Sequence, residues 1–120
     1  MNADIKKLWL EALRSGEYKQ GKSALHQKYR GEDRYCCLGL LCEIAAQKGI
    51  VTKVIDVDDG RASYDGEALF LPQRVVEWAE LLTSSGDPTV EYKDHFEHLS
   101  TLNDDGKRFT TIASLIEKSL

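Results

Sequence analysis

An apolar run in the middle of the chain, Cys36 to Cys42, dictates how the rest of the protein must be built. The run reads CCLGLLC, and the segment that begins at Cys37 is apolar on nearly every side for two turns before it ends at Lys48-Gly49. Lysine followed by glycine at that point is typical of a helix end. A helix that is apolar all round must be enclosed by other elements. We therefore expect this segment to form a central buried helix.

Apolar residues at three- and four-residue spacing predict amphipathic helices on both sides of this segment. One predicted helix runs from Asp4 to Arg14, one follows Pro72, and a terminal one spans Phe109 to Leu120. Leu99 and Leu102 predict one further helical turn. For the helix after Pro72, the apolar positions expected to face the core are Val75, Val76, Ala79 and Leu82.

Turn signals predict short strands between these helices. Gly31 to Asp33 marks a turn, which predicts a hairpin between Ala24 and Cys36. Asp59-Gly60 is a strong two-residue hairpin turn, and it separates the β-branched segment 51–57 from a returning strand over Arg61 to Leu71, with a kink at Asp65-Gly66. We expect an additional short strand at 89–92.

Other polar segments give no strand signal. We expect residues 17–23 to form a polar connector and His95 to His98 to form a solvated loop.

Length and composition place these elements in one unit. The chain has 120 residues, of which 42% are hydrophobic and 30% are charged, an ordinary balance for a globular domain. The predicted fold class is α+β. We expect a single compact domain over residues 1–120, with about four helices packed around the central buried helix and a small antiparallel sheet or hairpin.

The distribution of charge excludes several classes of partner. The net charge is −4, and lysine and arginine are scattered along the sequence, so we predict no direct binding to nucleic acid. Mimicry of DNA would need long carboxylate-rich faces, whereas Asp56, Asp58, Asp59 and Asp65 form only a local cluster.

The amino terminus lacks the apolar stretch of a signal peptide, and no segment approaches about 20 apolar residues, so we expect a cytoplasmic protein without a membrane partner.

Three cysteines, Cys36, Cys37 and Cys42, form the first group with chemical potential. An odd number clustered within seven positions does not fit a secreted disulfide framework, so we expect reduced thiols. A thiolate near a helix amino terminus is a good nucleophile, with His26, His95 or His98 as the possible base. Aliphatic neighbours favour buried packing instead, because burial raises the pKa of a thiol.

Metal binding is a second possibility that the spacing disfavours. Cys37 and Cys42 with His95 and His98 have the composition of a zinc site. On one helix, however, the two cysteines lie about 140° apart around the axis. The acidic run Asp56–Gly60 is similar to a calcium loop, but its glycine stands at the fifth position rather than the sixth. We predict no metal and no cofactor.

A polar loop offers the best candidate for ligand binding. The segment Tyr18–Ser23 lacks the first glycine and the preceding strand of a phosphate loop, yet its backbone N–H groups could line a pocket. Asn103 and Asp104 lie in a run, Asn103–Gly106, whose ordinary role is a turn or the cap of the following helix. We select no catalytic residues. The candidate ligand-binding residues are Arg14, Gln20, Asn103 and Asp104.

Several of these segments together resemble a known group of proteins. The motifs are WLEALRSGEYKQG at 9–21, YCCLGLLCE at 35–43, LP at 71–72 with WA at 78–79, and LNDDG at 102–106 followed by Phe109, IA and IE. The chain resembles, over nearly its whole length, a family of small, mostly uncharacterised proteins encoded by phages and prophages. The family pattern more often has valine where Leu40 stands and aspartate where Glu43 stands, which are mild changes.

This resemblance implies a setting and no catalytic residues. It implies a phage accessory protein, acting in the host cytoplasm, that binds without catalysis and counters host defence by inhibiting an immune protein or sequestering a nucleotide signal. The expected partner is a host protein or an anionic small molecule. Two alternatives stay open, a cysteine-dependent enzyme using Cys36 or Cys37 and a structural protein that forms homo-oligomers or virion contacts.

Overall fold

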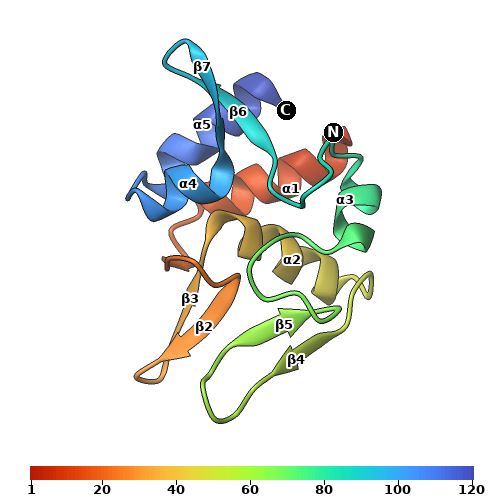
Figure 1. The fold of residues 1–120 in the computed structure, drawn as a ribbon, viewed down its shortest axis with the longest axis vertical. Helices are drawn as coiled ribbons and strands as arrows, with labels where there is room; N and C mark the ends of the chain where they lie inside the picture. Colours follow the sequence, from red (N-terminus) through yellow and green to blue (C-terminus); the bar gives the residue numbers. More distant parts are fainter.

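Five helices and seven short strands make up the computed structural model, which describes residues 1–120 (Figure 1). The helices are α1 (Ala3–Arg14), α2 (Cys37–Gln47), α3 (Gln73–Ala79), α4 (Leu99–Asp104) and α5 (Phe109–Ser119). The strands are β1 (Lys19–Gln20), β2 (His26–Tyr29), β3 (Glu32–Tyr35), β4 (Lys53–Ile55), β5 (Ala62–Tyr64), β6 (Thr89–Tyr92) and β7 (His95–His98). One contiguous core unites them, which confirms the predicted single α+β domain.

Helix α2 is the centre of that core, as predicted. Every residue from Cys37 to Cys42 is buried, and the helix packs against α1, α3, α4 and β3 (Figure 1). Cys36 caps the helix, because the Gly39 N–H donates to its Sγ at 3.4 Å. The indole Nε1–H of buried Trp9 donates to the Cys37 carbonyl at 2.9 Å and so fixes α1 to the start of α2.

The strands form three small sheets. The first has the order β1-β3-β2, with β1 parallel to β3 and β2 antiparallel to it, while β4–β5 and β6–β7 are antiparallel hairpins. A bridge between Gln27 and Arg61 connects β2 to the second hairpin. Both predicted hairpins are therefore present. The second is not closed by the predicted two-residue turn at Asp59-Gly60, because Ile55 pairs with Ala62 and residues 56–61 connect the strands. In the first, the reversal lies at Arg30-Gly31, both at positive φ, rather than at 31–33.

Two polar segments expected to be loops contain strands instead. Residues 19–20 in the predicted connector pair in parallel with Arg34 and Tyr35. A parallel partner is not joined to its neighbour by a tight turn, so no local pattern announces it. His95 to His98 pair with β6 although all four are polar or exposed, because this hairpin keeps one face in solvent.

Leu82 corrects the prediction for the helix after Pro72. The helix ends at Ala79 because Glu80 adopts a left-handed conformation, with φ of 57°. The chain then turns so that Leu81 enters the core at 7% exposure while Leu82 is 99% exposed. The helical repeat holds only as far as the helix itself continues. None of the five helices is long and apolar enough to cross a membrane.

Candidate functional site

Asn103 lies at the centre of a buried polar network that joins distant parts of the chain. Its side chain is 1% exposed, and its Oδ1 accepts from Gln20 Nε2 at 2.9 Å and from the Cys37 backbone N–H at 3.1 Å. Its Nδ2 donates to the Gly21 carbonyl at 2.8 Å and to Asp104 Oδ1 at 3.2 Å. We call this group of five residues the Asn103 node. It ties β1, the start of α2 and helix α4 together.

The node corrects the expected role of residues 103–106. Asn103 and Asp104 belong to α4 rather than to a turn, and the residue that precedes α5 is Arg108, whose side chain makes no capping hydrogen bond. Asp104 Oδ1 instead accepts from the Ser23 N–H at 2.9 Å, and the Gly21 N–H donates to Tyr35 at 2.7 Å. These two N–H groups of the loop are therefore engaged within the protein rather than directed at a pocket.

The structure brings three of the four predicted ligand-binding residues together. Gln20, Asn103 and Asp104 are in the node, whereas Arg14 lies on α1 and forms an exposed ion pair with Glu117 of α5 at 2.7 Å. That guanidinium lowers the pKa of the Glu117 carboxyl through a hydrogen bond.

Gln20, Asn103 and Asp104 line none of the surface hollows. The largest hollow, about 430 Å³, lies between α1 and the end of α2. Direct ligand binding by Gln20, Asn103 and Asp104 stays a prediction.

The node also fixes a lysine at the surface. Gln20 Nε2 donates to the Lys107 carbonyl at 2.7 Å, just after α4. The ammonium of Lys107 lies 5.6 Å from the centroid of the Tyr92 ring, and that of Lys93 lies 5.3 Å from it. The nearby ammonium groups, that of Lys107 more strongly than that of Lys93, lower the pKa of the Tyr92 phenol. We call Tyr92, Lys93 and Lys107 the lysine–tyrosine cluster.

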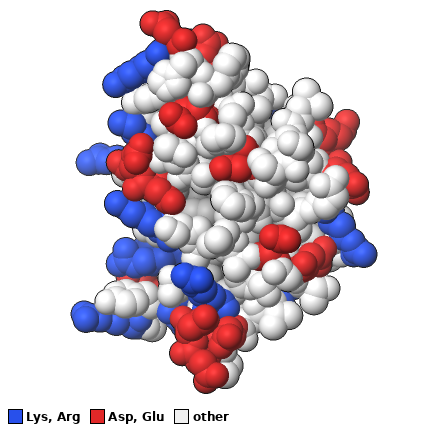
Figure 2. Space-filling model, viewed as in Figure 1, with Lys and Arg blue, Asp and Glu red and all other residues white.

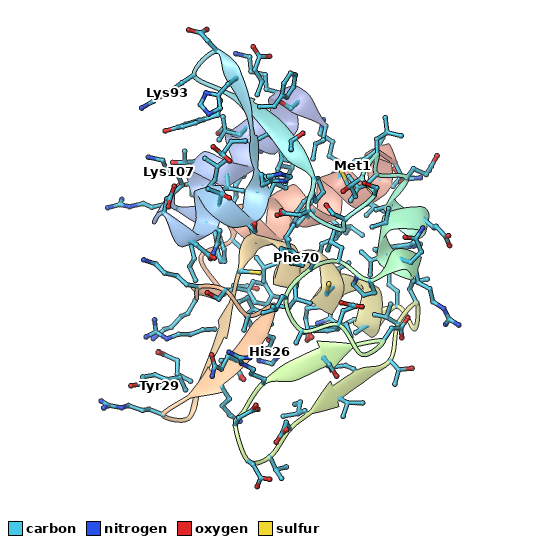
Figure 3. All side chains as sticks on the ribbon, viewed as in Figure 1. Met1, His26, Tyr29, Phe70, Lys93 and Lys107 are labelled. Carbon is cyan, nitrogen blue, oxygen red and sulfur yellow. The ribbon has the colours of Figure 1, made fainter.

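Sequence reasoning missed this cluster. Tyr92 ends β6 and Lys93 begins the turn after it, whereas Lys107 follows α4 fourteen positions later, and nothing in the local pattern links them. Lys93 and Lys107 extend from the same edge of the molecule, which also carries Tyr29 further down (Figure 3). A cation covers the Tyr29 ring as well, because the guanidinium of Arg30 lies 5.3 Å from its centroid.

Positive charge gathers along this edge, contrary to the expectation that it is scattered. Figure 2 shows lysine and arginine along one side of the molecule, over β1 to β3, the α4–α5 turn and the β6–β7 hairpin. Segments 19–34, 93–94 and 104–108 hold eight of the 16 basic residues but only five of the 20 acidic ones. We call these segments the basic edge. They are positive by three charges, whereas the remainder is negative by seven.

The fold produces this segregation by bringing remote segments together. Lys19 and Arg34, neighbours across the β1–β3 pairing, share the carboxylate of Glu32, and their hydrogen bonds lower its pKa, that from Lys19 more strongly. One carboxylate between two cations leaves a net positive charge. The sequence pattern alone does not show this grouping, because it depends on which strands pair.

The three cysteines are free and buried. Desolvation raises the pKa of the Cys36 thiol to about 11 and raises those of Cys37 and Cys42 well above their usual range. The Cys37 thiol donates to the Leu99 carbonyl at 3.6 Å rather than to a histidine. The protein environment therefore favours the neutral thiol over the nucleophilic thiolate.

The histidines have other partners. His26 Nε2 lies 2.9 Å from Asp33 Oδ1 with its ring stacked on Tyr35, and His95 and His98 lie on exposed β7. No group of three or more His, Cys, Asp or Glu side chains is arranged to hold a metal ion.

The acidic run at 56–60 serves the hairpin turn. Asp56 Oδ1 accepts from the Asp58 N–H at 2.8 Å, and Asp59 Oδ1 accepts from the Arg61 N–H at 2.8 Å. Asn and Asp side chains stabilise turns in this way. These bonds give Asp56 and Asp59 a structural role in the connection of the β4–β5 hairpin.

Comparison with known proteins places the whole chain in one family. Residues 1–120 match the family described as "Domain of unknown function (DUF8296)". The chain belongs to DUF8296. The DUF8296 match covers the Asn103 node and the basic edge alike, because it spans every element of the fold. No curated protein and no solved structure matches the chain.

Proposed function

We propose that this protein acts by non-catalytic binding and that the basic edge is the surface that recognises an anionic partner. The observation that carries the proposal is the segregation of charge, a positive edge on a molecule whose net charge is −4. Complementary potentials of this kind steer association and select partners. The proposal keeps the partner classes expected from the sequence, a host protein or an anionic small molecule.

The extent of the edge favours a protein partner. The molecule measures 42 × 27 × 24 Å, and the basic edge follows its longest axis (Figure 2). A surface this long matches the dimensions of a protein–protein interface better than those of a small ligand. We therefore propose an acidic surface of a host protein as the partner, within the phage or prophage counter-defence setting that the resemblance implies.

The state of the cysteines supports binding over thiol chemistry. A nucleophilic cysteine needs an accessible thiolate, whereas Cys36, Cys37 and Cys42 are buried and their pKa values are raised. Titration of the native protein with a thiol reagent tests this point. We expect slow labelling of all three thiols until denaturant is added. Rapid labelling of any one thiol in the native protein supports the cysteine enzyme instead.

Matched charge reversals test the basic edge. Lys28→Glu with Arg30→Glu changes the edge, and Lys7→Glu with Lys48→Glu makes the same change in net charge elsewhere. None of these four side chains forms an ion pair. Partners are captured from host lysate on immobilised wild-type protein, identified, and measured for affinity.

We expect the edge variant to weaken binding at least tenfold and the control variant to leave it within about twofold. Raising the salt concentration should weaken the wild-type complex toward the level of the edge variant. Equal losses in the two variants, or no loss in either, contradict recognition by the basic edge.

A further inference from the structure

We infer that the lysine–tyrosine cluster is an anion clamp for a phosphate-type oxyanion. The inference rests on the proposed function, because the clamp is the part of the basic edge that anchors the anionic partner. Tyr92 and Lys93 enter it from the β6–β7 hairpin and Lys107 from the turn before α5. Its ligand has two negative charges and at least three oxygen acceptors.

Two cations converge on one aromatic ring. The Lys93 and Lys107 ammonium groups lie 5.3 and 5.6 Å from the Tyr92 centroid, and neither belongs to an ion pair. The adjacent carboxylates of Asp94 and Asp105 make no ion pair with them. In the same hairpin, Glu97 is the acidic residue that does pair, and its partner is His95 at 3.4 Å.

This arrangement of two cations lacks a compensating negative charge. Two ammonium groups held near each other repel, and a single carboxylate neutralises only one of them. A phosphate-type group has about two negative charges and three acceptor oxygens, so it can accept from both ammonium groups and from the Tyr92 hydroxyl at once. The donor set therefore fits a dianion better than a carboxylate.

The protein holds the backbone of the clamp in place. Lys93 and Asp94 both have positive φ, 47° and 67°, as in the two-residue turn that closes a tight hairpin. His95 Nδ1 lies 3.1 Å from the Lys93 carbonyl. On the other side, Gln20 holds the Lys107 carbonyl at 2.7 Å. Fixed backbones lower the entropy that a ligand must remove on binding.

Inorganic phosphate is the probe for the first experiment. It is titrated into the full chain at constant ionic strength while backbone amide shifts are followed by NMR, with acetate and chloride as comparison anions. We expect shifts centred on residues 92, 93 and 107, and a dissociation constant about tenfold weaker in Lys93→Gln and in Lys107→Gln. Lys48→Gln, remote from the clamp, should bind phosphate as the wild type does.

The ionisation of Tyr92 gives a second readout. Difference absorbance between wild type and Tyr92→Phe isolates this phenol from the other tyrosines. We expect phosphate to raise the pKa of Tyr92, because a bound dianion offsets the field of the two lysines. Equal effects of acetate and phosphate, or phosphate shifts that survive both lysine substitutions, indicate an adventitious ion only and overturn the clamp.

Two further ligands separate the possible sources of the phosphoryl group. A nucleoside 5′-monophosphate represents a free small molecule, and a phosphoserine peptide with its unphosphorylated twin represents a modified partner. Whichever binds more tightly than inorganic phosphate identifies the source. The Lys28→Glu and Arg30→Glu reversals lie outside the clamp, so this variant should lose partner capture while it still binds phosphate. Partner capture that stays intact in this variant contradicts the edge. Lost capture in this variant together with no phosphate binding by the wild type contradicts the clamp alone.

Discussion

The side chain of Asn103 makes four hydrogen bonds inside the protein, and we predict that its removal strongly destabilises the fold. Asn103→Ala leaves the buried Cys37 N–H and the Gly21 carbonyl without these partners. Unsatisfied buried groups cost about 1–3 kcal/mol each, so we expect the free energy of unfolding to fall by about 2–4 kcal/mol in urea denaturation. Asp105→Ala, at an exposed neighbour, should change it by less than about 0.5 kcal/mol. Equal effects of the two substitutions contradict the structural role of the node.

A second residue-scale prediction concerns pH. The hydrogen bond from His26 lowers the pKa of Asp33 in the folded protein. As the pH falls, the Asp33 carboxylate is therefore protonated at a higher pH in the unfolded chain than in the folded one. The bond therefore stabilises the protein above the ordinary pKa of aspartate, and this contribution is lost as pH falls through the lowered value. We expect Asp33→Asn to be less stable than wild type near pH 6, with the difference shrinking below about pH 4. A pH-independent difference in melting temperature contradicts this linkage.

At the scale of elements, the contact between α2 and the chain entering β2 depends on Gly39. Alanine normally stabilises a helix interior over glycine by about 1 kcal/mol. Here an added Cβ comes within 1.6 Å of the Leu25 carbonyl oxygen, which belongs to the backbone and cannot rotate away. We expect Gly39→Ala to lower the free energy of unfolding by about 3 kcal/mol or more, since helix and strand must separate.

Gly16→Ala is the control for Gly39→Ala. A Cβ at Gly16 meets nothing within 4 Å, although φ there is +75°. The left-handed backbone alone should cost about 1–2 kcal/mol. A Gly39→Ala protein as stable as Gly16→Ala shows that α2 can move away from Leu25 at little cost.

At the scale of the whole molecule, the segregated charge should be visible without any partner. The protein has a net charge of −4, yet we expect the basic edge to retain it on a sulfopropyl cation exchanger at pH 7 and low salt. Lys28→Glu with Arg30→Glu should abolish retention, whereas Lys7→Glu with Lys48→Glu should not. Both variants have the same net charge, so their elution positions report how charge is placed. Coincident elution contradicts a functional segregation of charge.

Local patterns suffice to predict those parts of the fold that local chemistry determines. The apolar run in α2 is long enough that any fold must bury it. Asp59-Gly60 correctly predicts a hairpin, but residues 56–61 connect its strands, so the two-residue turn itself is not present. The extent of a helix depends on more. Leu82 has the right spacing, but the left-handed Glu80 ends α3 before it. The parallel pairing of β1 with β3 has no local signal either.

The candidate site likewise has features that residue type predicts and features that depend on tertiary contacts. Residue type was enough to group Gln20, Asn103 and Asp104, because amides and carboxylates near turns seek hydrogen-bond partners. It could not show that those partners lie within the protein. Arg14 is as polar as the others, but α1 directs it toward Glu117. Lys93 and Lys107 meet only because α4 packs beside the β6–β7 hairpin, a tertiary contact with no counterpart in sequence spacing.

The Asn103 node has a consequence for when the recognition surface exists. Gln20 and Asn103 are separated by 83 positions, and the basic edge contains pieces from both sides of that gap. A ribosome must release almost the entire chain before these pieces can meet. No short synthetic peptide reproduces the epitope, and antibodies raised against the assembled edge should fail to stain the denatured protein on a blot.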